Sequence, residues 1–120
     1  MSQRIRSLTL QGKDILVIDL TDCSAAEVTA TVRAVPDYVT SHALASVRIL
    51  TDFTGAVFDD EAVRATKESA VFDKPYVKKS AWIGVDALPP SFREDISSFA
   101  RREFPVFTTR KEALEWLEKD

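Results

Sequence analysis

Residues 48–61, RILTDFTGAVFDDE, predict the centre of the fold. An apolar run is followed by a short turn that contains Gly55, and three acidic residues then open a helical segment. We interpret this order as a buried strand that leads through a loop to the N-terminus of a helix. In open α/β folds, loops at the carboxyl ends of strands commonly recognise ligands or partners. The stretch therefore predicts both an architecture and a candidate binding surface.

The composition is that of one compact domain, which we expect to span residues 1–120. Hydrophobic residues make up 45% and charged residues 29%, with 3 Gly and 5 Pro, so neither a disordered nor a fibrous chain is expected. No apolar run approaches the roughly 18 residues that cross a bilayer, and no signal-peptide core follows the N-terminus, which predicts a cytoplasmic protein. The net charge of -3 argues against binding to nucleic acid, which requires a basic surface.

The chain has one cysteine, Cys23, and one histidine, His42, which excludes an intrachain disulfide and a Cys/His zinc site. We therefore expect no metal and no cofactor. Cys23 precedes the first predicted helix, where the helix dipole could lower its pKa, or it simply packs in the core. His42 follows the same helix and is expected to cap its C-terminus.

The sequence before residue 46 predicts two strands and a helix. Residues 5–10 and 15–20 form an antiparallel hairpin through a four-residue turn at 11–14. The second strand is apolar at nearly every position and should be central, whereas the first should lie at an edge. The inward-facing residues expected of the first strand are Ile5, Leu8 and Leu10.

A capping box should start the first helix, because Ser24 and Glu27 have the required spacing. One apolar stripe should pack this helix on the sheet, and Pro36 should kink the helix or divide it in two. The stripe consists of Val28, Val32, Val35 and Val39.

The remaining sequence predicts alternating strands and helices. A strand at 46–51 lies a helix length after the second strand, so a right-handed crossover makes the two parallel and the fold α/β. Phe92, Ile96 and Phe99 give the third helix its apolar stripe, behind a capping box that begins at Ser91. The other elements are a helix at 60–72, a strand at 81–85, a proline-marked edge strand at 104–107 and a terminal helix capped by Thr109, which gives the order ββαβαβαβα.

This order of elements, with a strand leading through Asp52 and Gly55 into a helix opened by acidic residues, resembles the STAS domain of sulfate transporters and anti-sigma-factor antagonists. Three segments are similar to the small stand-alone bacterial SpoIIAA-like proteins: LTD at 50–52, KPYVKKSA at 74–81 leading to IGV at 83–85, and TRKEALEWL at 109–117. The likeness spans nearly the whole chain. It implies an α/β, STAS-like (SpoIIAA-like) fold, a mostly parallel mixed sheet with helices mainly on one face, related to the CRAL-TRIO lipid-binding domains. It implies no catalytic residues.

The start of the second predicted helix departs from the pattern of these relatives. In anti-sigma-factor antagonists, a Ser or Thr at this position is phosphorylated and the added charge switches partner binding, whereas residues 58–61 (FDDE) have no hydroxyl there. Asp59, Asp60 and Glu61 either cap the helix or present a permanent negative patch where relatives carry a switchable phosphate. Thr54 is the nearby hydroxyl, and it precedes the expected position by several residues. We therefore expect a protein without the usual phosphoswitch.

Two groups of residues are candidates for binding a partner or ligand. Phe53 and Phe58 flank the glycine turn and either anchor a partner or fold inward to close the core. The segment between the second helix and the fourth strand adds a tyrosine and several lysines, which either bind an anionic or acidic partner or are ordinary solvated charge. These lysines include Lys78 and Lys79. The candidate set is Asp52, Phe53, Thr54, Gly55, Phe58, Asp59, Asp60, Lys74 and Tyr76.

The leading hypothesis is a non-enzymatic, STAS-like regulatory domain whose loop and helix start at 52–61 bind another protein. The chain could also form a homodimer through an edge strand. The alternative is a carrier of a lipid or small apolar ligand that associates transiently with membranes, and it predicts a sizeable apolar cavity under the helices. An enzyme is disfavoured because the sequence shows neither a nucleophile–base pair nor a metal-binding cluster.

Overall fold

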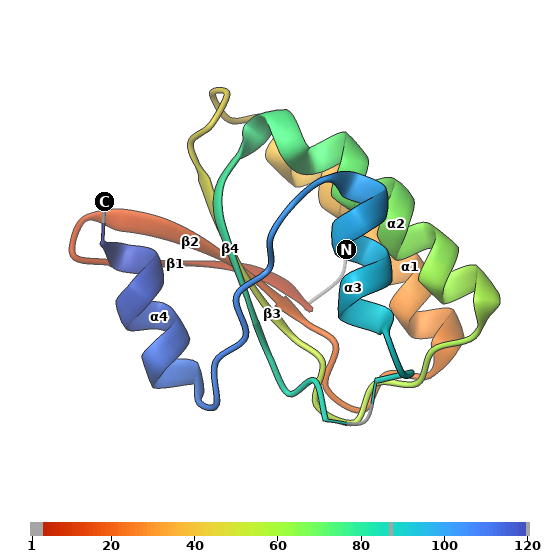
Figure 1. Cartoon of the computed structure of the whole chain (residues 1–120). Coiled ribbons are helices and arrows are strands. Elements are labelled where there is room, and N and C mark those ends of the chain that lie inside the picture. Colours follow the sequence, from red (N-terminus) through yellow and green to blue (C-terminus); the bar gives the residue numbers. More distant parts are fainter. Residues whose placement is uncertain (1–3, 87, 120) are drawn as a thin grey trace.

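A computed structural model describes residues 4–86 and 88–119. The chain forms a mixed sheet with helices on both faces (Figure 1). In chain order the elements are β1 (Ile5–Leu10), β2 (Lys13–Asp19), α1 (Ala25–Val39), β3 (Val47–Asp52), α2 (Asp60–Asp73), a 3₁₀ turn η1 (Lys74–Tyr76), β4 (Val77–Ile83), α3 (Phe92–Ala100) and α4 (Arg110–Glu118).

The sheet has the strand order β1-β2-β3-β4, in which β1 and β2 are antiparallel and the other neighbours are parallel. The parallel pairs are joined by helical crossovers, as parallel neighbours require. Val17 pairs with Leu50, and Leu50 pairs with Ala81, so the apolar centres of three strands lie side by side. The predicted α/β class, the edge position of β1 and the central position of β2 are confirmed.

Figure 1 shows α1, α2 and α3 on one face of the sheet and α4 on the other. This arrangement follows from central strands that are apolar at successive positions and must be covered on both sides. In β2, Leu16 and Ile18 pack beneath α1 to α3, whereas Ile15 and Val17 pack beneath α4. The expectation that the helices lie mainly on one face is confirmed.

The segment at 104–107 does not form the predicted edge strand and contacts β4 through one bridge, between Trp82 and Val106. The backbone N–H of Trp82 donates to Pro105 O at 2.9 Å, and the N–H of Phe107 donates to Trp82 O at 2.9 Å. Pro105 has no N–H with which to extend this ladder along β4. The sheet of the described residues therefore has four strands.

Two strands, β2 and β4, begin earlier than predicted. The hairpin turn consists of Gln11 and Gly12, with φ of 52° and 76°, so β2 begins two residues earlier than expected. A two-residue turn with positive φ matches the twist of antiparallel strands better than a longer one. β4 begins at Val77 and not at residue 81, because its first half pairs with β3 from Val47 onward.

The apolar residues of β1 do not share one face. Ile5 packs in the core beneath α1 to α3, whereas Leu8 and Leu10 pack against the core beneath α4. The prediction that all three face the same side is wrong, because side chains alternate between the faces of a strand with a period of two.

The start of α1 is the predicted capping box. Ser24 Oγ accepts a hydrogen bond from the N–H of Glu27 at 3.2 Å, and Glu27 Oε1 accepts one from the N–H of Ser24 at 2.9 Å. Pro36 does not divide the helix, which runs unbroken to Val39, and the Pro36 carbonyl accepts a hydrogen bond from Thr40. The four valines of the predicted stripe are all buried.

The capping box predicted for α3 is wrong. The N–H of Phe92 donates to Pro89 O in a tight turn that places Ser91 in the left-handed region, with φ of 64°. A serine caps a helix from an extended backbone, so the Ser91 side chain makes no capping hydrogen bond. The predicted stripe is also wrong at its end, since Phe99 is 55% exposed and Ala100 takes the buried position.

Candidate functional site

The loops that follow β2, β3 and β4 meet at one edge of the sheet, at the carboxyl ends of the parallel strands (Figure 1). Backbone hydrogen bonds join them. The N–H of Asp22 donates to Thr54 O at 2.8 Å, that of Val57 to Cys23 O at 2.9 Å, and that of Phe53 to Ile83 O at 3.0 Å. The loop after β3 is therefore fixed between its two neighbours.

Two glycines make this close approach possible. Gly55 and Gly84 have φ of +71° and +70°, which a residue with a Cβ adopts only with strain. A Cβ on Gly55 would collide with the carboxylate of Asp22, and a Cβ on Gly84 would lie 2.6 Å from the backbone nitrogen of Thr54. The prediction that Gly55 provides a positive φ is confirmed, whereas the sequence did not single out Gly84.

The buried carboxylate of Asp52 holds the loop in place through contacts of both of its oxygens. Its Oδ1 accepts hydrogen bonds from the N–H and the hydroxyl of Thr54, at 3.0 and 2.6 Å. Its Oδ2 pairs with Arg110 at 3.1 Å, which offers a reason for a positive charge at the start of α4, where the helix dipole disfavours it. Asp52 is only 8% exposed, so it can support a binding surface but offers a partner little contact.

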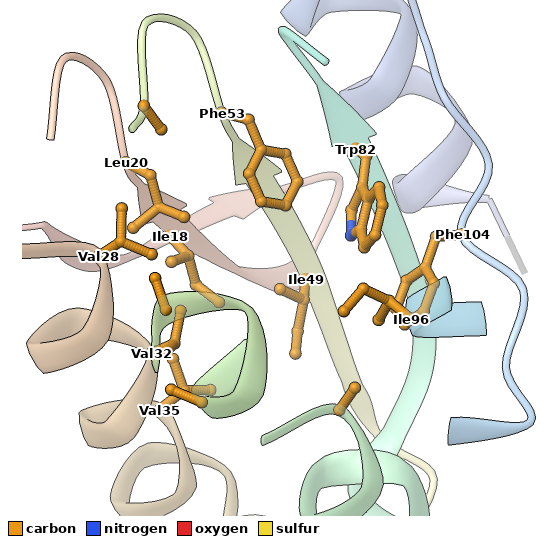
Figure 2. Packing of buried hydrophobic residues seen from close by; sticks show 14 of the residues in the cluster. Ile18, Leu20, Val28, Val32, Val35, Ile49, Phe53, Trp82, Ile96 and Phe104 are labelled. Carbon is orange, nitrogen blue, oxygen red and sulfur yellow. The ribbon is translucent and has the colours of Figure 1, made fainter. Parts of the chain in front are cut away.

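The two phenylalanines of the candidate set point into the core. Phe53 is 2% exposed and makes ring contacts with Phe58, Trp82 and Phe92, at centroid distances of 6.0, 4.9 and 5.8 Å. Figure 2 shows Phe53 and Trp82 side by side beneath the loop. Phe58 is half-buried and packs on Phe92 at 4.7 Å. Of the two interpretations, the structure adopts the one in which both rings close the core.

The three acids at the start of α2 have different environments. Asp59 caps the helix, since its Oδ1 accepts a hydrogen bond from the N–H of Ala62 at 2.8 Å. Glu61 pairs with Arg33 at 3.4 Å on the surface, where such pairs contribute little stability. Asp60 is exposed at the first helical position.

An exposed surface remains on this edge, which we call the β3–α2 surface and define by Thr54, Val57 and Asp60. Val57 is apolar yet 57% exposed, because its backbone is held by Cys23 while the rings beside it turn inward. No sequence signal indicated the exposure of Val57, since it stands between two apolar neighbours like any core residue.

Lys74 and Tyr76 lie away from this surface. They follow the last residue of α2, and a helix of 14 residues separates its ends by about 20 Å. Tyr76 is half-buried and stacks on Phe72, with ring centroids 6.4 Å apart. The nine candidate residues therefore do not form one site.

The lysines expected in this loop belong to β4. Lys79 Nζ donates to the carbonyls of Trp116 and Lys119, at 2.7 Å each, and lies 4.6 Å from the centre of the Trp116 ring. The placement of Lys78 and Lys79 in a basic loop between the second helix and the fourth strand is therefore wrong. Lys79 holds the C-terminal end of α4 against the sheet.

The cysteine and the histidine that the sequence offered for reactivity both have structural roles. Burial raises the pKa of the Cys23 thiol, which is fully buried, so the reactive interpretation is wrong and the packing interpretation is confirmed. His42 Nδ1 lies 2.9 Å from the carbonyl of Tyr38 and caps the C-terminus of α1, as predicted. Within residues 4–86 and 88–119, no group of three His, Cys, Asp or Glu residues could hold a metal ion.

A cavity of about 50 Å³ lies between the sheet and helices α1 to α3. Pockets for drug-sized ligands are several times larger, roughly 300 Å³ or more. The cavity at this position is therefore too small to be the sizeable apolar cavity that a lipid carrier requires. No helix of the described residues has the length and apolar character needed to span a bilayer. The cavity is lined by Leu20, Val32, Ile49, Thr51, Phe53, Thr66, Ser69, Ala70, Asp73, Ser80, Trp82, Ile96, Arg102 and Phe104.

No protein-family model matches the sequence, and no curated protein matches it significantly. Solved structures similar to this one include the following two. An uncharacterised protein of the DUF3478 family with a SpoIIAA-like fold, from Shewanella loihica PV-4, aligns with a TM-score of 0.67 and 17% identity over 94% of this chain and 91% of the other. An anti-sigma-factor antagonist (STAS) domain protein from Planctomyces limnophilus aligns with a TM-score of 0.58 and 17% identity over 96% and 98%. The chain therefore has a STAS-like, SpoIIAA-like fold.

Proposed function

We propose that this protein is a non-enzymatic regulatory domain that acts in the cytoplasm and binds another protein through the β3–α2 surface. The observation that carries the proposal is Val57, an apolar side chain that is 57% exposed on a loop held by its neighbours. The STAS-like fold fits such a role, since one of the similar solved structures is an anti-sigma-factor antagonist (STAS) domain protein.

The fixed geometry of the loop favours binding. A surface that is ordered before a partner arrives loses little conformational entropy when the complex forms. Val57 supplies an exposed apolar side chain, and Asp60, three residues later in the chain, supplies an exposed carboxylate. Charge complementarity then favours a partner with a basic surface and speeds the association.

Binding through this surface does not depend on a phosphate at the helix start. Asp59 occupies the capping position, and its carboxylate supplies a permanent negative charge there. The hydroxyl of Thr54 already donates to Asp52 Oδ1 at 2.6 Å, within the network that shapes the loop. We therefore propose an interaction without the usual Ser/Thr phosphoswitch.

The test is affinity capture from a lysate of the source organism, with the wild type compared with Val57→Asp and Asp60→Lys. Both substitutions change exposed side chains outside the core, so the fold should be kept, as circular dichroism would verify. A true partner should be enriched by the wild type and at least tenfold less by each variant. Lys74→Glu, a charge reversal at the other end of α2, is the matched control and should retain the partner. Equal capture by all four proteins would overturn the proposal.

The lipid-carrier alternative is the weaker proposal, because the cavity of about 50 Å³ has no room for an acyl chain. Liposome flotation at low salt tests it directly. Flotation of the wild type that is lost in Lys74→Glu, together with equal partner capture by the wild type, Val57→Asp and Asp60→Lys, would favour the alternative over protein binding.

A further inference from the structure

The cavity beneath α1 to α3 has apolar walls and one polar end. Figure 2 shows the apolar walls, where Ile49, Trp82 and Ile96 face the space between the sheet and the helices. The polar end is formed where α2 ends, by Ser69 and Asp73, and by Arg102 from the segment after α3. The cavity therefore resembles a site for a small molecule with one polar group.

Asp73 is the unusual member of this polar end. The residue is 4% exposed, and its Oδ2 accepts a hydrogen bond from Ser69 Oγ at 2.9 Å. Its Oδ1 is buried and has no hydrogen-bond partner among the described residues. A buried carboxylate oxygen without a donor is costly, and native proteins rarely leave one unsatisfied without an ordered water or ligand.

The charge balance indicates what kind of molecule fits. Among the residues that line the cavity, those from α1, α3 and the sheet are uncharged, and the charged ones are Asp73 and Arg102. Arg102 Nη1 donates to Ala70 O at 2.8 Å, and its guanidinium lies 4.7 Å from the centre of the Phe104 ring. Because this cation already balances the carboxylate, the missing donor is best supplied by a neutral molecule.

We propose that the cavity binds a small neutral molecule that donates a hydrogen bond to Asp73 Oδ1 and rests against the apolar walls. A buried water needs about 10–15 Å³ of such space, so about 50 Å³ admits a few heavy atoms and no more. Water and short-chain alcohols share this chemistry. The site lies inside the domain and does not depend on partner binding at the β3–α2 surface.

The first arm of the test is a high-resolution crystal structure of the wild type, obtained without alcohols. We expect density for a water within hydrogen-bond distance of Asp73 Oδ1. The second arm is an NMR titration with ethanol, which should produce a saturable shift of the indole N–H of Trp82. The other tryptophan, Trp116, packs on the opposite side of the sheet and reports non-specific solvent effects. Its resonance should change only linearly with ethanol.

Two variants check that the response comes from this cavity. Asp73→Leu removes the acceptor and should weaken the apparent affinity for ethanol at least tenfold. Ala70→Leu leaves the carboxylate in place and fills the space, so the saturable shift should disappear. Water on Oδ1 without a saturable ethanol response supports the proposal, with water as the occupant. An empty cavity, together with parallel linear shifts of both indoles, would overturn it.

Discussion

The two faces of the sheet carry cores that are closed in different ways. Beneath α1 to α3, the core contains aromatic rings and a cavity that ends at Asp73, a buried carboxylate. Beneath α4, the core is smaller, and its buried residues are aliphatic side chains and alanines, with the rings of Phe107 and Trp116 partly buried against them. There, Arg48 and Lys79 reach the last turn of α4 and donate to its terminal carbonyls, so the polar groups at this end are satisfied.

The difference shows where this fold tolerates an unsatisfied group. Cations at the C-terminus of a helix complete its orphan carbonyls and also interact favourably with the dipole. At the C-terminus of α2, Arg102 likewise donates to the carbonyl of Ala70, but the carboxylate of Asp73 also lies there, near the negative end of the helix. The face with three helices therefore has room for an occupant, and the face with one helix is closed by its own side chains.

The largest effect is expected from Phe53, which links the loop of the β3–α2 surface to the core below it. Phe53→Ala should lower the free energy of unfolding by about 3–5 kcal/mol, since it opens a cavity among packed rings. Urea denaturation monitored by circular dichroism measures this change. Phe99→Ala is the matched control on an exposed ring and should alter stability by no more than about 0.5 kcal/mol. Similar costs for the two variants would show that the aromatic cluster does not hold this face together.

The second prediction concerns the pH dependence of stability and tests Asp73, the buried carboxylate on the face beneath α1 to α3. Burial raises the pKa of this carboxyl from 3.8 to about 6, partly offset by the Ser69 hydrogen bond and the charge of Arg102. Between these values the folded chain keeps the proton and the unfolded chain releases it. The free energy of unfolding should therefore fall by about 2 kcal/mol as the pH rises from 4 to 6, and this contribution should level off above about pH 7.

Comparison with Asp73→Asn isolates this contribution from those of other groups. Urea denaturation at pH 4, 5, 6 and 7 should show that the variant gains stability relative to the wild type as the pH rises. A difference that stays constant across this range would mean that Asp73 titrates normally and that this end of the cavity is open to solvent.

On the opposite face, the third prediction removes one of the cations that close the core. Arg48 is 6% exposed, and its Nη1 donates to the carbonyls of Leu117 and Lys119 at 2.6 and 2.8 Å. Arg48→Met should cost about 2 kcal/mol, because these carbonyls lose charge-assisted hydrogen bonds. Hydrogen exchange should accelerate in α4 and remain unchanged in α1. Arg64→Met, on the exposed side of α2, is the control, and equal exchange in both variants would contradict the role of Arg48.

The sequence predicted what depends on local pattern. Apolar runs located β2 and β3, and the spacing of Ser24 and Glu27 located the start of α1. It failed where distant contacts decide the outcome. Lys79 looked like a loop residue because it is charged, yet its ammonium group is satisfied by α4, about 40 residues later in the chain.

The candidate site likewise combines features that local motifs predict with features that distant contacts decide. The turn at Gly55 and the capped helix start follow from short motifs and were predicted. The pair of Asp52 and Arg110 spans 58 residues, and no local signal connects them. The exposure of Val57 depends on how neighbouring rings pack, which the residue types alone do not determine.

The smallest predicted effect compares two serines that the sequence treats alike. Both precede a helix and have a glutamate three residues later, but Ser24 caps from an extended backbone and Ser91 has a φ of 64°. Ser24→Ala should cost about 1 kcal/mol, whereas Ser91→Gly should stabilise the protein by several tenths of a kcal/mol, since glycine relieves the left-handed strain. Thermal denaturation of the two variants measures both changes. Any loss of stability in Ser91→Gly, even of about a few tenths of a kcal/mol, would mean that Ser91 caps α3 in solution, and that the face beneath α1 to α3 is closed more tightly at this end than the structure indicates.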